Sequence, residues 1–100
     1  MNVFIVTGRA GSMSWPAKVF HYEFAAHIWE QVATTAAHSC AKDFVSVSWT
    51  KEFNLLPDAG KREVDDALLA PFKALDSNCP MPPEQWKNIS YEVKRVALHD

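Results

Sequence analysis

Two N-terminal segments have the apolar pattern of β-strands. Residues 3–6 are apolar on both faces, which is typical of a central strand that is covered on two sides. Residues 8–12 contain two glycines and predict a turn after that strand. Aromatic residues then alternate at Phe20, Tyr22 and Phe24, which predicts a second strand running to about residue 24.

A long helix is the alternative for this second segment. It would start after Ser14 and carry Pro16 in its first turn, where proline is well tolerated. The sequence leaves both interpretations open.

The next segment has the period of an amphipathic helix. At about 100° per residue, its apolar side chains form one stripe and its polar side chains fall on the opposite side. We therefore predict a helix over residues 25–41. The apolar stripe consists of Ala25, Ile28, Trp29, Val32, Ala33, Ala36 and Cys40.

The middle of the chain predicts a strand, a loop and a second helix. Residues 43–50 alternate between apolar and polar side chains, as a strand with one buried face does. Residues 54–60 contain Pro57 followed by Asp58 and predict a loop. In the helix that follows, Pro71 removes one backbone hydrogen bond and should cause a kink or a restart. Its apolar face consists of Val64, Ala67, Leu68, Phe72 and Leu75.

The end of the chain predicts an extended connection over residues 78–83, one helical turn over residues 84–88 and a last strand. The apolar positions of this strand change phase by one residue after Val93, which predicts a β-bulge near Arg95. These positions are Ile89, Tyr91, Val93, Val96 and Leu98.

The predicted order is therefore β-β-α-β-α-β. Such an order is typical of an α+β sandwich with two helices on one face of a mostly antiparallel sheet. The length of 100 residues predicts a single domain.

Composition and charge argue against several classes of protein. No apolar run reaches the ~20 residues that span a bilayer. Twelve acidic and ten basic residues give a net charge of −2. Direct binding to nucleic acid is therefore not expected, since it depends on clustered Lys and Arg. A nucleic-acid-associated module that uses Arg9, Lys18, Lys94 and Arg95 remains the weakest alternative.

Cysteine usage and the N-terminal residues predict a cytoplasmic protein. Cys40 and Cys79 are too few for a disulfide framework, and we expect two reduced thiols, one in the core and one in a loop. The N-terminal residues lack the basic and long apolar regions of a secretory signal.

Motifs for catalysis or cofactor binding are missing from the sequence. Residues 7–12 hold two glycines after a strand, but no lysine stands beside Ser12 as a phosphate-binding loop requires. The histidines at positions 21, 27, 38 and 99 do not have the spacing of a zinc site. We therefore expect no catalytic residues, no cofactor and no metal.

The four tryptophans are the most unusual feature of the composition. Trp29 and Trp49 fall on apolar faces and are expected in the core. Trp15 and Trp86 have no buried register, and tryptophan is typical of protein interfaces. They either anchor a partner or cover the core from folded-back loops. Leu69 lies off the apolar face of its helix and is a further candidate for partner contact.

Acidic residues gather around the second predicted helix. An acidic helix can accelerate association with a basic protein, such as one that handles nucleic acid. We assign Asp65 and Asp66 to this partner surface. The acidic residues of the region are Asp58, Glu63, Asp65, Asp66 and Asp76.

In size, acidity and lack of motifs, the chain resembles the small inhibitors encoded by phages and mobile elements, including anti-CRISPR proteins. This resemblance identifies no residue. The leading prediction is a small protein-binding, inhibitor-like module that is not an enzyme and acts by occupying a surface of a partner protein. The alternative is a ligand-binding or enzymatic α+β domain, which could be homodimeric.

Overall fold

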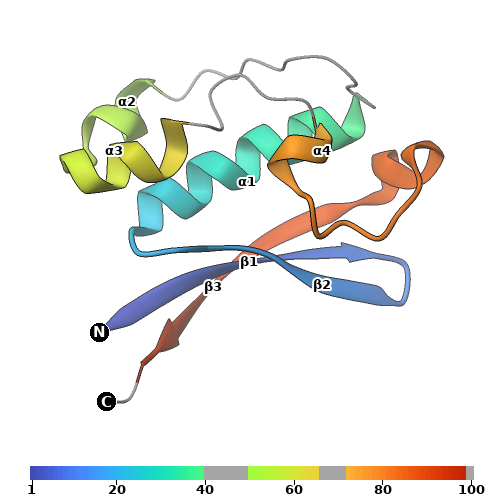
Figure 1. The fold of residues 1–100 in the computed structure, drawn as a ribbon, viewed down its shortest axis with the longest axis horizontal. Coiled ribbons are helices and arrows are strands. Elements are labelled where there is room, and N and C mark those ends of the chain that lie inside the picture. The colour runs from blue at the N-terminus through green and yellow to red at the C-terminus, as the bar shows by residue number, and fades with distance from the viewer. Residues whose placement is uncertain (40–49, 66–71, 99–100) are drawn as a thin grey trace.

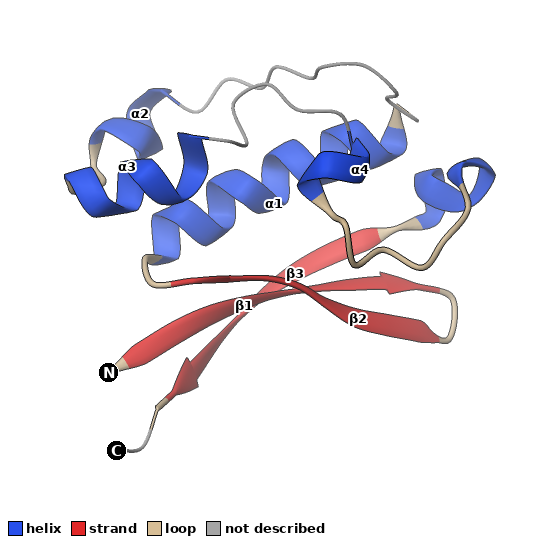
Figure 2. Cartoon of the chain, viewed as in Figure 1, coloured by secondary structure: helices blue, strands red, loops and turns tan. Residues whose placement is uncertain are grey.

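The computed structural model describes residues 1–39, 50–65 and 72–98 of the chain. Within these residues, three strands form one antiparallel sheet in the order β2-β1-β3. The central strand is the apolar N-terminal segment, as predicted, but the described helices cover only one of its two faces (Figures 1 and 2), whereas the sequence predicted cover on both. The strands are β1 (Asn2–Ala10), β2 (Met13–Phe20) and β3 (Ser90–Ala97).

The described helices lie together on one face of this sheet (Figures 1 and 2), so the fold class is α+β, as predicted. The longest described helix, α1, runs across the sheet and contributes most of the helical side of the core. The helices are α1 (Glu23–His38), α2 (Thr50–Asn54), α3 (Asp58–Asp65), α4 (Phe72–Leu75) and the 3-10 helix η1 (Pro83–Asn88).

A tight hairpin joins β1 to β2. Ala10 pairs with Met13, so that only Gly11 and Ser12 form the loop. Gly11 has a φ of 62°, a left-handed conformation that glycine adopts without steric cost. The predicted turn is confirmed, although β1 continues to Ala10 before it.

The strand interpretation of the segment before α1 is correct, and the long-helix alternative is wrong. The strand ends at Phe20 and not at residue 24. Tyr22 has an extended backbone with φ −123° and ψ 133° and forms the N-cap of α1. The aromatic alternation was misleading because its three members have different environments: Phe20 is buried, whereas Phe24 is 41% exposed in the first turn of the helix.

The predicted apolar stripe of α1 is buried through Ala36, and Cys40 lies outside the described residues. The helix starts two residues earlier than predicted. Trp29 is the largest side chain buried on it, with its ring 6.2 Å from that of Phe20 and 5.5 Å from that of Tyr91. These contacts pack α1 against both edge strands. The buried residues of α1 are Ala25, Ala26, Ile28, Trp29, Val32, Ala33, Ala36 and Ala37.

The β-bulge predicted near Arg95 is wrong. The pairing of β1 with β3 continues in register from Asn2 opposite Ala97 to Arg9 opposite Ser90. The apolar phase changes because Val93 packs against the helix-covered core, whereas Val96, three positions on, falls on the other face.

The register shift of the sheet lies on β2 instead. Val6 pairs with Lys18 and Thr7 pairs with Pro16, so Ala17 is the extra residue. Proline is compatible with this position because β2 is an edge strand of the sheet.

Three predictions fall wholly or partly outside the described residues. The strand predicted over residues 43–50 lies outside the described residues except for Thr50, which begins α2. The kink predicted at Pro71 lies outside the described residues, and the predicted second helix is described only in α3 and α4.

The loop predicted over residues 54–60 is too long, since α3 starts at Asp58. The predicted turn over residues 84–88 is confirmed by η1.

A buried carboxyl group joins the helix layer to both edge strands. Asp76, which directly follows α4, is 0% exposed. Its Oδ2 accepts a hydrogen bond of 3.0 Å from Trp15 Nε1 on β2 and one of 2.5 Å from the Tyr91 hydroxyl on β3. Because two donors from opposite sides of the sheet converge on one oxygen, this group fixes the segment after α4 above the sheet.

The same arrangement explains a glycine in the central strand. Gly8 pairs with Trp15, and a Cβ atom at Gly8 would lie 2.5 Å from the indole ring. The ring therefore occupies the space that a side chain of β1 would need. Only glycine allows Trp15 to lie across β1 and reach Asp76.

We expect Asp76→Ala to lower the free energy of unfolding by about 2–5 kcal/mol, because it leaves two buried donors without an acceptor. Asp76→Asn retains a carbonyl oxygen and should lose less. Denaturant unfolding measures both changes. Asp65→Ala, at an exposed position of α3, is the control and should stay within about 0.5 kcal/mol of wild type. An equal effect of Asp65→Ala and Asp76→Ala would contradict the assigned role of Asp76.

We expect stability to fall at alkaline pH through Tyr91. Burial, together with the hydrogen bond to Asp76, raises the pKa of Tyr91 well above its usual range. The folded state therefore keeps the phenol proton while the unfolded state loses it above about pH 10. This group should lower the free energy of unfolding by up to about 1.4 kcal/mol per pH unit as pH rises further.

Denaturant unfolding between pH 9 and pH 11.5 measures this slope. Tyr91→Phe should remove that part of it, and Tyr22→Phe, which keeps Tyr91, should not. Parallel curves for the wild type and Tyr91→Phe would contradict the prediction.

Candidate functional site

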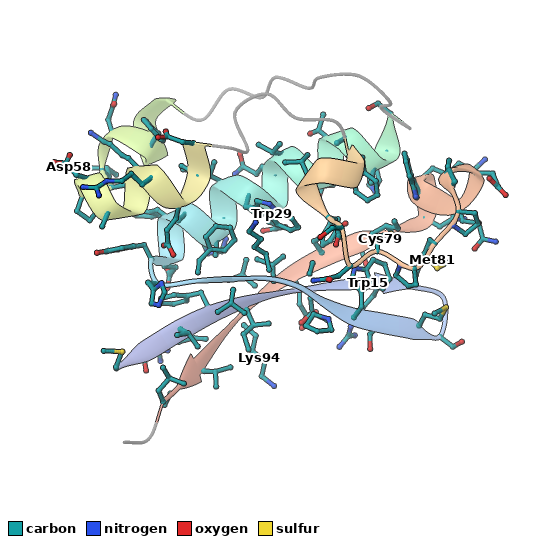
Figure 3. All side chains as sticks on the ribbon, in the orientation of Figure 1. Trp15, Trp29, Asp58, Cys79, Met81 and Lys94 are labelled. Carbon is teal, nitrogen blue, oxygen red and sulfur yellow. The ribbon has the colours of Figure 1, made fainter. Side chains whose placement is uncertain are left out.

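The two tryptophans predicted as candidate anchors are buried. Trp15 is 6% exposed and Trp86 is 2% exposed. The Trp86 indole N–H donates to the carbonyl oxygen of Met81 at 3.0 Å, and its ring lies 4.5 Å from that of Phe72. Figure 3 places Trp15 beside the connection that carries Cys79 and Met81. Of the two alternatives for these tryptophans, the structure therefore has the one in which they cover the core.

The acidic surface predicted around the second helix is smaller than expected. Asp76 belongs to the core and not to this surface. Glu63 is bonded to His21, with 2.9 Å between Oε2 and Nδ1. Asp65 is exposed at the end of α3, whereas Asp66 and Leu69 lie outside the described residues. What remains of the described acidic surface on α3 is Asp58 and Asp65, next to the exposed Arg62.

The sheet has a second apolar surface, on the face opposite the described helices. Successive residues of a strand point to opposite faces, and cross-strand partners share a face. Phe4 and Val6 of β1 contact the helix-covered core, so Val3 and Ile5 fall on the other face, outside that core. The register then places Val19 and Lys94 on either side of Ile5, and Val96 beside Val3.

We call Val3, Ile5, Val19 and Val96 the open-face patch. Val19 is 52% exposed, Ile5 and Val96 are partly exposed, and Val3 is buried at 8% exposure. The described helices leave this face of the sheet uncovered (Figure 2). β-Branched side chains give it a rigid shape, because their rotamers are restricted. This patch is a candidate contact surface for another molecule.

Basic residues accompany the patch on the same sheet. Lys94 is exposed and points away from the helices (Figure 3). Lys18 and Arg95 are also exposed, but they pair with Val6 and Phe4, so the register places them toward the helix-covered face and not on the open face. Arg9 is exposed toward the hairpin end and pairs weakly with Glu92 at 4.0 Å between Nη2 and Oε1. The three described strands together contain one acidic residue, Glu92. The sheet is therefore basic, although the whole chain has a net charge of −2.

Sequence reasoning identified these four basic residues only as a possible nucleic-acid group. It missed the patch, because Val3, Ile5, Val19 and Val96 come from three separate segments that only strand pairing brings together. The period-2 pattern of β1 was a usable signal, since it showed apolar residues on both faces.

The chemistry of this surface is aliphatic and cationic. The aromatic side chains of the sheet, Phe4, Trp15, Phe20 and Tyr91, contact the helix-covered core. The open face therefore offers aliphatic contact and ammonium or guanidinium groups, and no ring of the described strands is available there for stacking on a base.

The described residues form neither a metal-binding cluster nor a membrane-spanning helix. Among the described residues, no cluster of three or more His, Cys, Asp or Glu side chains could hold a metal ion. None of the described helices is long and apolar enough to cross a membrane.

Comparisons of the chain with models of protein families, with curated proteins and with solved structures found no significant match.

Proposed function

We propose that the protein is a small protein-binding module and that its contact surface is the open-face patch with the basic residues around it. The single observation that carries this proposal is the row of β-branched side chains beside Lys94, on the sheet face that the described helices leave uncovered (Figure 2). Burial of such side chains supplies the free energy of association, while the surrounding charges select the partner and speed its approach.

The charge of the surface favours an acidic partner protein. Arg9 and Lys94 are exposed on the open face of the sheet, and Glu92 is the acidic residue of that face. If two copies paired through this face, each would bring two basic groups and one acidic group, and this excess of like charge costs free energy. A partner with a small apolar centre and acidic residues around it complements both features of the patch.

Nucleic acid fits this surface less well. Proteins that bind nucleic acid mainly through its charged backbone make about 6–10 phosphate contacts. These strands have too few basic side chains to make that number of contacts. Proteins that hold single strands on a sheet use exposed aromatic rings, and the open face of the described strands is aliphatic.

This proposal changes the partner that the sequence suggested. The sequence favoured a basic partner that docks on Asp65 and Asp66, with Trp15 or Trp86 as anchor. The proposed surface is basic instead, and its anchor residues are Val19 and Ile5. The inhibitor role, of the kind that anti-CRISPR proteins have, is the finer part of the proposal: in the cytoplasm, the module would act by occupying a surface that its partner needs.

We expect the double variant Val19→Glu with Lys94→Glu to bind the partner at least about 30-fold more weakly, since it removes apolar contact and reverses a charge. The melting temperature should change little, because both side chains are exposed. Tagged wild-type protein and this variant are used to capture proteins from the native host. Each partner that only the wild type retains is then purified and measured by surface plasmon resonance at two salt concentrations.

A matched control carries the same changes away from the open face. Leu55→Glu with Lys87→Glu alters an exposed apolar residue between α2 and α3 and an exposed lysine of η1. This control should bind like the wild type. The proposal fails if the two double variants lose the same proteins, if nuclease treatment releases what is captured, if the partner is a second copy of the chain, or if no partner distinguishes the variants.

A further inference from the structure

A cavity of about 450 Å³ lies between the start of β1, the turn after β2 and α3. Its volume is within the ~300–1,000 Å³ typical of small-molecule sites. The residues that line it are Met1, Asn2, His21, Tyr22, Ala59 and Glu63. The cavity therefore combines apolar side chains with one imidazole, one phenol, one carboxylate and the carboxamide of Asn2.

Glu63 holds His21 in one orientation. The backbone N–H of His21 donates to both carboxylate oxygens of Glu63 at 3.1 Å, and the ring Nδ1 lies 2.9 Å from Oε2. A carboxylate only accepts hydrogen bonds, so Nδ1 carries the hydrogen. In the neutral imidazole this leaves a lone pair on Nε2. Since the His21 side chain is 67% exposed, a molecule in the cavity can reach this ring.

Tyr22 forms a second fixed wall. Its ring packs against the core and against Gly60 of α3, where an added Cβ atom would lie 3.2 Å from two ring carbons. The absence of a side chain at Gly60 lets the ring approach α3 closely. Both polar walls of the cavity are thus positioned before a ligand arrives, which reduces the entropic cost of binding.

We propose that this cavity binds a small molecule with an apolar body and a hydroxyl group, such as a phenol, and that the hydroxyl donates a hydrogen bond to Nε2 of His21. An anionic ligand fits less well because the Glu63 carboxylate lies on the same wall. A cation fits less well because the oxygens of Glu63 already accept three hydrogen bonds. This site is separate from the open-face patch and does not depend on the proposed function.

Phenol and anisole test the site, because the two probes share a ring and only phenol has a hydroxyl donor. Each is titrated into ¹⁵N-labelled protein and followed by ¹H–¹⁵N correlation spectra. Phenol should shift the amide signals of His21, Tyr22 and Ala59 in a saturable way, with a dissociation constant in the millimolar range. Anisole should bind at least about threefold more weakly, as loss of one hydrogen bond predicts.

Variants separate the hydrogen bond from the shape of the cavity. His21→Phe keeps a ring of similar size but removes the acceptor, so phenol should then bind no better than anisole. His27→Phe is the matched control, because His27 pairs with Glu30 at 3.6 Å on α1 and does not line the cavity. Ala59→Leu keeps His21 and narrows the cavity from α3, and should weaken both probes.

Three results would overturn the proposal. They are equal affinity for phenol and anisole in the wild type, shifts that spread over the surface without saturating at the cavity, and unchanged phenol binding in His21→Phe or Ala59→Leu. Melting temperatures show whether each variant folds. If His21→Phe does not fold, phenol binding to Ala59→Leu tests whether the cavity is the binding site.

Discussion

The hydrogen bonds of Asp76 are the interaction on which the rest of the described fold depends. One buried oxygen accepts from Trp15 on β2 and from Tyr91 on β3, and so connects the segment after α4 to both edge strands of the sheet. Within the described residues its other oxygen, Oδ1, has no hydrogen-bond partner. A buried polar group is costly unless it is bonded, so this carboxyl group confines Trp15 and Tyr91 to one arrangement. Gly8 is a consequence of that arrangement, because the Trp15 ring occupies the space of a side chain there.

This packing gives the two faces of the sheet different chemistry. The aromatic rings of the strands are used to pack against α1 and to reach Asp76, which leaves aliphatic and basic side chains on the other face. A chain of net charge −2 thereby acquires a basic surface, because its acidic residues lie mostly outside the strands. The proposed protein contact and its preference for an acidic partner both follow from this separation.

The pair of His21 and Glu63 has a similar role at the opposite end of the sheet from the hairpin. It connects the turn after β2 to α3, and at the same time it fixes the imidazole at the cavity. Both polar clusters bridge the strand and helix layers, yet they differ in exposure. Asp76 is sealed in the core and serves the fold, whereas His21 remains open to a ligand.

The sequence by itself determined the features that depend on local periodicity. These are the central position of the apolar segment 3–6, the stripe of α1, the hairpin turn, the turn at η1 and the α+β class. Tertiary structure decided the rest, because the partners are far apart in the chain: Trp15 and Asp76 are 61 positions apart, and His21 and Glu63 are 42 apart. The burial of Trp15 and Trp86, the removal of Asp76 from the acidic surface and the formation of the open-face patch all depend on such pairs. No local pattern encodes them, since a residue's period shows which face it occupies but not what covers that face.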